Sequence, residues 1–540
     1  MDLSSFDPAS LKILDRLDDL ERLLREPRQI LTGDDGPAPE THEARAPVPV
    51  PNQQDGPPPR SCLPERVENV LQWPCFFNGS MPKELFSTTS PCSAANPMVG
   101  NGSLAELSEM QPAEINVLLD NYFTYVHCKN PVLDELSTRR LVRRVFLDGI
   151  DWSPESCLAM IVCALGCVSG PFGPSHNFSI GTPAHNNSRV FFQAAQKRIG
   201  MLLVTSDVTG PQCLFLLGVY MMTVFQPVYA WRFFSQALAA CQQFSFLACA
   251  QHVHSVSGLA SDAVERGHQD TPEQAVYWSA WKSEREVRAE LSLPDFTTHD
   301  SWSTLYPPFF PAPPSPSEEQ SPRSAPDSLE HRSRAAWLFY LAEISLRRLN
   351  SRLCGEILTM SQKYAPTAKL LEFLSEVVPE YETQAREWAT SLPTGLSIHS
   401  NPAEEDDVCR FVLRGHHINL FEHLYWAFNM ACMDGHAMGR LVSPKIQDMA
   451  YKGLETHIGR LHVNEPGFMH RHHGTIFMVK SCTRSALLLV SSACSGMQMP
   501  PGWKDAVYKA IGLLEYWARE VPDLLHWKAT LERGIGNAPS

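Results

Sequence analysis

Short catalytic motifs are missing from this sequence of 540 residues. It contains no GxSxG nucleophile turn, no Walker phosphate loop, no GxGxxG turn and no HExxH zinc pair, which are the usual local signs of hydrolase, nucleotide-binding or metalloprotease chemistry. We therefore predict that the protein is not an enzyme and that it has no catalytic, cofactor-binding or metal-ligating residues.

Long apolar runs are also missing. The two longest, 157–168 and 213–225, are shorter than the roughly 18–20 residues that a membrane-spanning helix needs. We expect no contact with a membrane. The 15 cysteines are scattered, and no apolar signal segment opens the chain, so a reducing compartment is expected. Cys157, Cys163 and Cys167 share an apolar helical segment and are assigned to the core.

Positive charge is scarce. The chain has 59 acidic against 45 basic residues and a formal charge of -14, which excludes a nucleic-acid surface spread over the whole molecule. Arg139, Arg140, Arg143 and Arg144 form one local basic stripe at helical spacing. We interpret this stripe as a solvated helix face.

The composition favours a large, packed, all-α body. Hydrophobic residues make up 44% of the chain and charged residues 19%, enough apolar side chains for a packed interior. Few segments alternate as strands do, whereas Pro, Gly and Asn separate segments with helical periodicity. The predicted helices lie near 112–126, 135–147, 153–169, 187–206, 210–225, 229–249, 272–291 and 333–360.

Residues 1–26 are predicted to form a short dimerisation helix. Ile13, Leu17, Leu20 and Leu24 recur at alternating four- and three-residue spacings, the pattern of a coiled-coil seam. The seam covers barely three heptads, so a single amphipathic helix that packs on the body is the alternative.

Residues 27–110 are predicted to be a mostly disordered Pro/Ser-rich linker, since nine prolines fall between Pro27 and Pro59. Isolated apolar residues such as Leu71 and Trp73 could dock as a short segment, and this is left open. Residues 111–535 then form the helical domain, with a loop or subdomain boundary at 304–328, where the chain is again rich in proline.

Histidines gather at two places. His470, His472 and His473 could supply nitrogen ligands, but no Cys, Asp or second His pair stands nearby at zinc spacing, which favours a polar start of a helix. His416 and His417 precede an apolar helical segment, and we interpret them as helix-surface residues.

Three sequence motifs occur one after another along the chain. The first contains Tyr122-Phe123, then His127 and Pro131. The second runs from Gln212 to Tyr220 and is followed by Ala230 and Trp231.

The third segment, 277–294, contains Trp278, the neighbours Glu284 and Arg285, and Pro294. In this order the three segments resemble the regulatory domain of fungal zinc-cluster transcription factors. Further similar stretches extend the resemblance over residues 115–533. Ser292 stands where this family usually has glycine, which leaves the turn in doubt because serine is penalised at positive φ. A buried Glu284–Arg285 pair could fix the register of neighbouring helices.

The resemblance implies a nuclear regulator of RNA polymerase II transcription, for example of a metabolic or specialised-metabolite pathway. Relatives of this kind act as dimers, so the partners expected are a second copy or a related zinc-cluster factor, held through the N-terminal helix, and the transcription machinery.

The zinc cluster itself is not found in this chain. The family's DNA-binding module holds two zinc ions on six closely paired cysteines, whereas Cys62, Cys75 and Cys92 are too far apart. We expect DNA contact only through a missing module or a partner, and zinc only if an upstream cluster exists. The alternative function is a small-molecule-binding helical protein, or an enzyme without a recognisable catalytic motif, with its pocket between helices.

Overall fold

The computed structural model describes residues 61–76, 110–247, 271–293, 329–363, 368–399 and 406–538. Within these ranges the regular structure is helical throughout and no strand occurs, which confirms the predicted all-α class. The predicted dimerisation helix at 1–26, most of the linker and the boundary at 304–328 lie outside the described residues.

The first half of the described chain consists of short and medium helices. In order they are α2 (Val67–Val70), α4 (Pro112–Asn121), the π-helical turn η2 (Tyr122–Val126), the 3₁₀ turn η3 (His127–Lys129), α5 (Glu135–Asp148), α6 (Pro154–Cys167), the 3₁₀ turn η4 (His176–Phe178), α7 (Pro183–Gln196), α8 (Ile199–Leu202), α9 (Thr209–Thr223) and α10 (Pro227–Cys241).

The second half contains longer helices. They are α12 (Thr271–Leu291), α13 (Leu329–Lys363), α14 (Ala368–Ser391), the 3₁₀ turn η7 (Thr394–Leu396), α15 (Val408–Ala437), α16 (Pro444–Asn464), the 3₁₀ turn η8 (Glu465–Gly467), α17 (Thr475–Cys494), α18 (Trp503–Trp517) and α19 (Leu524–Asn537).

Local sequence explains where several helices begin. Proline occupies the first turn of α4, α6, α7, α10 and α16, where its missing N–H costs nothing. Asp134 caps α5 by accepting a hydrogen bond from the Ser137 N–H at 2.8 Å. Asp407 caps α15 in the same way, accepting from the N–H groups of Cys409 and Arg410.

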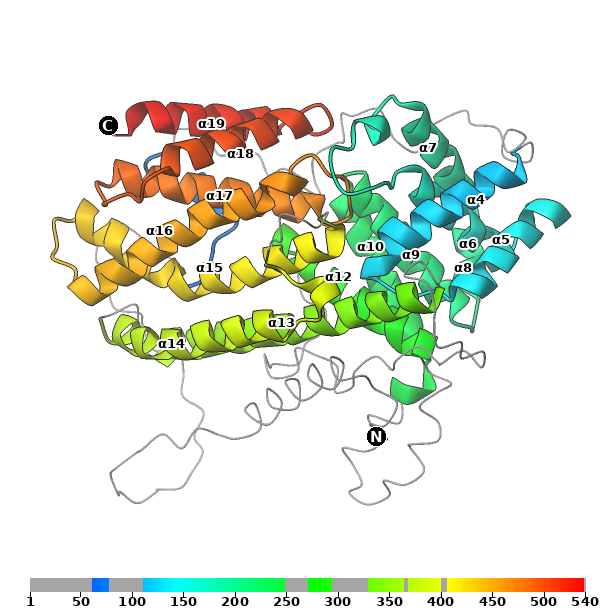
Figure 1. Cartoon of the computed structure of the whole chain (residues 1–540), viewed down its shortest axis with the longest axis horizontal. Coiled ribbons are helices and arrows are strands. Elements are labelled where there is room, and N and C mark those ends of the chain that lie inside the picture. The colour runs from blue at the N-terminus through cyan, green and yellow to red at the C-terminus, as the bar shows by residue number, and fades with distance from the viewer. Residues whose placement is uncertain are drawn as a thin grey trace, which may run out of the picture.

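The helices form two groups joined along one side (Figure 1). Helices α4 to α10 gather at one end of the molecule and α15 to α19 at the other. The long helix α13 and its successor α14 run along one edge, and α13 packs against η3, α14 and α15. A single apolar cluster continues through both groups.

The most apolar helices lie in the interior. Every residue of α6 from Ser156 to Cys167 is buried, so Cys157, Cys163 and Cys167 are core thiols as predicted. Helix α17 is long and apolar enough to cross a membrane by length and composition, and 83% of its most apolar stretch is buried inside the protein. That burial is typical of a core helix.

Residues 61–76 pack on the body. Val67, Val70, Leu71, Trp73 and Phe76 are all buried, and α2 contacts α17. The Trp426 indole of α15 donates a hydrogen bond to the carbonyl of residue 61 at 3.2 Å. The docking alternative therefore holds for this stretch of the range assigned to the linker.

Candidate functional site

The first group of family-signature residues forms an aromatic cluster around the turns η2 and η3. Tyr122 and Phe123 meet edge to face at 5.0 Å, and Phe123 meets His127 at 5.1 Å between ring centroids. His127 Nε2 donates to the Leu133 carbonyl at 2.8 Å, across the loop that contains Pro131. Burial lowers the pKa of His127 to about 4, so its ring is neutral at pH 7. These residues hold a turn in place.

The second group joins α10 to α12. The Trp231 indole donates a hydrogen bond to Glu284 Oε1 at 3.0 Å, and Arg288 pairs with the same carboxylate at 3.1 Å. Arg285 instead lies over the Trp281 ring, 4.5 Å from its centroid. Glu284 thus fixes the two helices together, but its basic partner is Arg288 and the adjacent Arg285 stacks on an indole.

Trp278 anchors the same helix and is fully buried, with Trp281 edge to face at 5.9 Å. At the end of α12 Ser292 has φ 49°, the left-handed conformation for which glycine is the usual residue. The Leu293 N–H closes the turn on the Arg288 carbonyl at 3.0 Å. Serine therefore adopts the turn at a conformational cost. Pro294 lies just outside the described residues.

A buried ion cluster joins α12, α13 and α15. Lys282 Nζ lies 2.5 Å from Glu343 Oε2, and Arg347 lies 2.9 Å from Glu343 Oε1. Burial alone would raise the pKa of Glu343, but these two cations hold it well below its usual range. His416 Nε2 adds a contact of 3.2 Å to Arg347. His416 thus belongs to this cluster, and the prediction of an ordinary surface histidine was wrong.

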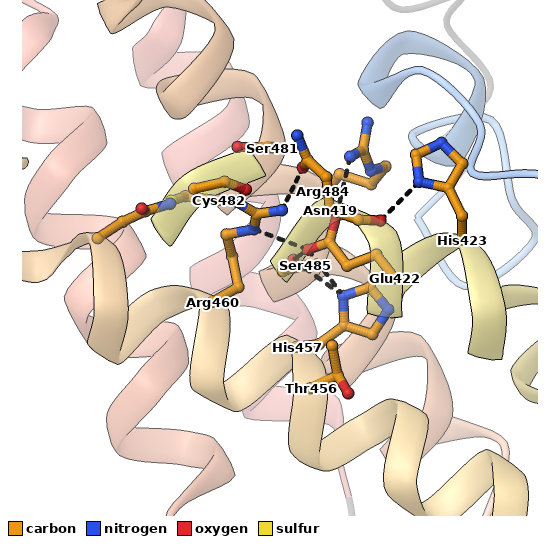
Figure 2. A network of polar contacts seen from close by, with 12 residues as sticks. Asn419, Glu422, His423, Thr456, His457, Arg460, Ser481, Cys482, Arg484 and Ser485 are labelled. Carbon is orange, nitrogen blue, oxygen red and sulfur yellow. Dashed lines mark hydrogen bonds and ion pairs between the residues drawn. The ribbon is translucent and has the colours of Figure 1, made fainter. Parts of the chain in front are cut away.

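A second buried network joins α15, α16 and α17 (Figure 2). At its centre Glu422 Oε1 accepts from Arg460 Nε and from Ser485 Oγ, both at 2.9 Å, while Arg484 pairs with Glu422 Oε2 at 3.2 Å. His457 Nδ1 lies 2.9 Å from Ser485 Oγ. Burial would raise the pKa of Glu422, but Arg460 and its neighbours hold it well below the usual value.

This network holds α15, α16 and α17 together. The side chains of Glu422 and His457 are both 0% exposed, and Ser485 is fully buried as well. Both Ser485 and His457 face the same oxygen of Glu422, whereas a catalytic relay would present the serine to a substrate. Arg460 also donates to the Gly415 carbonyl at 2.9 Å. We assign the network to fixing the register of α15, α16 and α17, because setting register is the best-attested role of buried charge.

The segment 470–474 connects the two helix groups. The Arg471 N–H donates to Ser175 Oγ at 2.8 Å and its Nη1 to the Thr223 carbonyl at 2.9 Å, while Nη2 pairs with Glu520. Its guanidinium lies over the Trp517 ring at 5.3 Å. A cavity of about 10 Å³ lies beside this segment, lined among others by Lys129, Thr223 and His472.

No group of three or more His, Cys, Asp or Glu side chains suited to a metal ion occurs in the described ranges. The basic stripe of α5 is partly used within the fold: Arg139 pairs with Asp120 at 2.7 Å, and Arg143 donates to Asn116 of α4 at 3.0 Å. The seam residues Ile13, Leu17, Leu20 and Leu24 lie outside the described residues.

Sequence reasoning missed the buried charges Glu422, Arg460, Lys480 and Lys129. Lys480 carried a visible signal, because it and Arg484 are the two charged residues in the largely apolar stretch from Ile476 to Val490. Glu422 likewise lies among apolar neighbours on a long helix. Their partners, 38 and 62 residues away for Glu422, could not be read from local pattern.

Comparison of this chain with protein-family models, with characterised proteins and with solved structures finds no match.

Proposed function

We propose that this chain is the regulatory body of a nuclear transcription regulator of the fungal zinc-cluster type. The proposal rests on the residues that carry the resemblance. These residues make contacts that stabilise the interior of the fold. The hydrogen bond from Trp231 to Glu284 is the observation that carries most weight, because it joins two motifs that lie 53 residues apart. A chance likeness between two helical segments would not require them to meet.

Tyr122, Phe123 and His127 of the first motif also support the proposal, since they form one ring cluster around a single turn. Regulation of RNA polymerase II transcription would follow through contacts with the transcription machinery. DNA would be reached through a separate module or a partner, because the six-cysteine zinc cluster of the family is not found in this chain.

A fusion experiment tests this function. The whole chain is joined to a heterologous DNA-binding domain and expressed in a fungal host with a reporter gene under the matching site. We expect the fusion to be nuclear and to change reporter expression several-fold relative to the DNA-binding domain alone. The matched control carries W231F, which removes the indole donor to Glu284. A soluble, nuclear fusion that leaves the reporter unchanged would rule the proposal out.

Dimerisation needs its own test. Replacing Leu17 and Leu20 with glutamate places charges in the predicted seam, so the sedimentation coefficient of the purified chain should fall to that of a monomer. Glutamate at the neighbouring Asp18 and Asp19 preserves the charge and serves as the control. An unchanged coefficient in the leucine variant removes the seam from the proposal.

The second candidate function is small-molecule binding. A groove of about 340 Å³ lies between α14, α15 and α16, lined by Glu382, Arg386, Tyr425 and Lys452 among others. This volume falls within the range of about 300–1,000 Å³ typical of ligand sites. A thermal-shift screen of metabolites would favour this function if a hit were lost in Y425F. Turnover of any hit would overturn the regulator proposal.

A further inference from the structure

Cys128 and Cys409 bring two thiols together from distant parts of the chain. Cys128 belongs to the 3₁₀ turn η3, and Cys409 lies in the first turn of α15, 281 residues later. The Cys409 thiol donates a hydrogen bond to the sulfur of Cys128, and its own sulfur lies 3.9 Å from the Cys128 carbonyl oxygen. Both are free thiols. The pair therefore has the proximity that a disulfide requires.

The surroundings of this pair favour the thiolate of Cys128. The hydrogen bond from Cys409 is the main cause that lowers the pKa of Cys128, and Lys129 acts in the same direction, against burial and the carboxylate of Asp407. Burial lowers the pKa of Lys129 in turn, and the two sulfurs oppose this shift. The shared hydrogen bond, together with burial, raises the pKa of Cys409 well above its usual value. Cys128 is thus the nucleophile of the pair and Cys409 its proton donor.

Access to solvent separates this pair from the thiols of the core. Cys128 is half-buried, whereas Cys157 and Cys213, which form a second hydrogen-bonded pair, are both 0% exposed. Burial raises the pKa of Cys213 well above its usual range. Oxidants react with accessible thiolates in preference to buried thiols. The two pairs thus differ in accessibility and in charge, and both differences favour reaction at Cys128.

We propose that Cys128 and Cys409 are a peroxide-sensitive dithiol site that forms a reversible disulfide. In the first step the Cys128 thiolate attacks one oxygen of hydrogen peroxide, the O–O bond breaks, hydroxide departs and Cys128 becomes the sulfenic acid. In the second step the Cys409 sulfur, after losing its proton to hydroxide, attacks the Cys128 sulfur, so the S–S bond forms and the S–O bond breaks. The two thiols lose two electrons, and the peroxide becomes two molecules of water. This inference is independent of the proposed function.

The disulfide would join the two helix groups (Figure 1). The turn η3 follows α4 in the first group, α15 opens the second, and α13 packs against both elements. A bond across 281 residues would restrict the unfolded chain strongly. Peroxide would therefore convert a junction held by non-covalent contacts into a covalent one, and a reducing thiol would release it.

Mass spectrometry of the full chain tests the site. The reduced protein is treated with hydrogen peroxide at pH 7, the remaining thiols are alkylated, and the digest is searched for linked peptides. We expect a pair that joins Cys128 to Cys409 and disappears after treatment with a reducing thiol. The Tm of the oxidised chain should lie about 4 °C above that of the reduced chain. If Cys128 and Cys409 both remained open to alkylation after peroxide, the proposal would be overturned.

Single variants separate the roles of the two thiols. In C409S the Cys128 sulfenic acid has no thiol to attack it, so it should persist and react with dimedone. In C128S, residue Cys409 should stay unlabelled. C75S removes an exposed thiol outside the pair and should leave the yield of linked peptide unchanged. Dimedone labelling of Cys409 in C128S to the same extent as Cys128 in C409S would overturn the assignment of Cys128 as the nucleophile.

The charge of Lys129 has its own test. K129Q removes the cation, so disulfide formation at pH 7 should become slower by about threefold or more, whereas K129R should keep the native rate. Equal rates in the two variants would exclude a role of this charge in activating Cys128. The linked peptide of the unmodified chain remains decisive for the dithiol site if a variant does not fold.

Discussion

Lys480 of α17 lies 3.0 Å from Glu68 of α2, and the same ammonium lies 2.8 Å from Glu290 of α12. The lysine is 2% exposed, so one buried ammonium group joins both α2 and α12 to α17. Burial alone would lower the pKa of Lys480, but the two carboxylates outweigh it and raise the pKa.

The variant K480M should lose about 3 kcal/mol of unfolding free energy, because it leaves Glu68 and Glu290 without their counter-charge. Urea denaturation measures this loss, and limited proteolysis should cut the 61–76 segment faster. K528M is the control, since its partner Glu515 is 66% exposed and the change should stay within about 0.5 kcal/mol. Equal stability of both variants would contradict a structural role for Lys480.

The variant E422Q should be destabilised by about 3–5 kcal/mol. It removes the only acidic charge facing Arg460 and Arg484 in the described network. E515Q, at an exposed pair, is the matched control. A urea midpoint that does not move in E422Q would show that the network contributes nothing net.

The free energy of unfolding should decrease as the pH falls, because histidines with lowered pKa values bind protons more readily in the unfolded chain. The pKa values of His127, His417 and His470 are each lowered to about 4, and burial is the main cause. The unfolded chain binds protons near pH 6.5 and the folded chain only near pH 4, so unfolding free energy is full above about 6.5 and declines between these limits.

The variant H127Q tests one of these groups. Its glutamine does not titrate, so near pH 5 the slope of unfolding free energy against pH should decrease by up to about 1.4 kcal/mol per unit. H436Q, at an exposed position of α15, is the control. Urea melts at half-unit intervals from pH 4.5 to 7 give the slope, and an unchanged slope in H127Q would refute the assignment.

The variant S292G should gain about 1 kcal/mol, because glycine enters the left-handed region without the penalty that serine meets at φ 49°. S292A keeps a Cβ and should gain nothing. A difference in Tm between the two variants therefore isolates the backbone effect. If S292A stabilised the protein as much as S292G, the strain would lie elsewhere.

At Gly166, where α6 packs against α4, replacing the native glycine should destabilise the protein. A Cβ on Gly166 would lie 2.2 Å from the Leu118 carbonyl oxygen, so G166A must push the helices apart and should cost at least about 2 kcal/mol. Nothing lies within 4 Å of a Cβ on Gly512 of α18, and G512A should stabilise by about 0.5–1 kcal/mol. Thermal unfolding of the pair distinguishes packing from helix propensity.

Local pattern predicted the helices well. The segment expected at 272–291 is α12 at 271–291, and that expected at 135–147 is α5 at 135–148. Pro272 lies in the first turn of α12 and the acidic N-cap Asp134 precedes α5, and both signals are properties of a few adjacent residues. The segment expected at 187–206 instead divides into α7 and α8, with Lys197 and Arg198 between them.

The buried charges could not be predicted, because their partners lie far away in sequence. Lys480 meets Glu290 across 190 residues, and Glu422 meets Arg484 across 62. His416 looked like a surface residue since only its own helix was considered, whereas Glu343 and Arg347 come from α13. Periodicity indicates which side of a helix is apolar, but not which helix covers it.

The docking of residues 61–76 also has a consequence for biosynthesis. Cys75 lies 416 residues before its partner Ser491, and Phe76 packs beside Gly534 near the other end of the chain. At ribosomal rates of about 5–20 residues per second, this segment waits roughly 20–80 s before its covering helices exist. Its tryptophan and phenylalanine are exposed during that time, so truncations within α17 to α19 should produce chains that depend on chaperones.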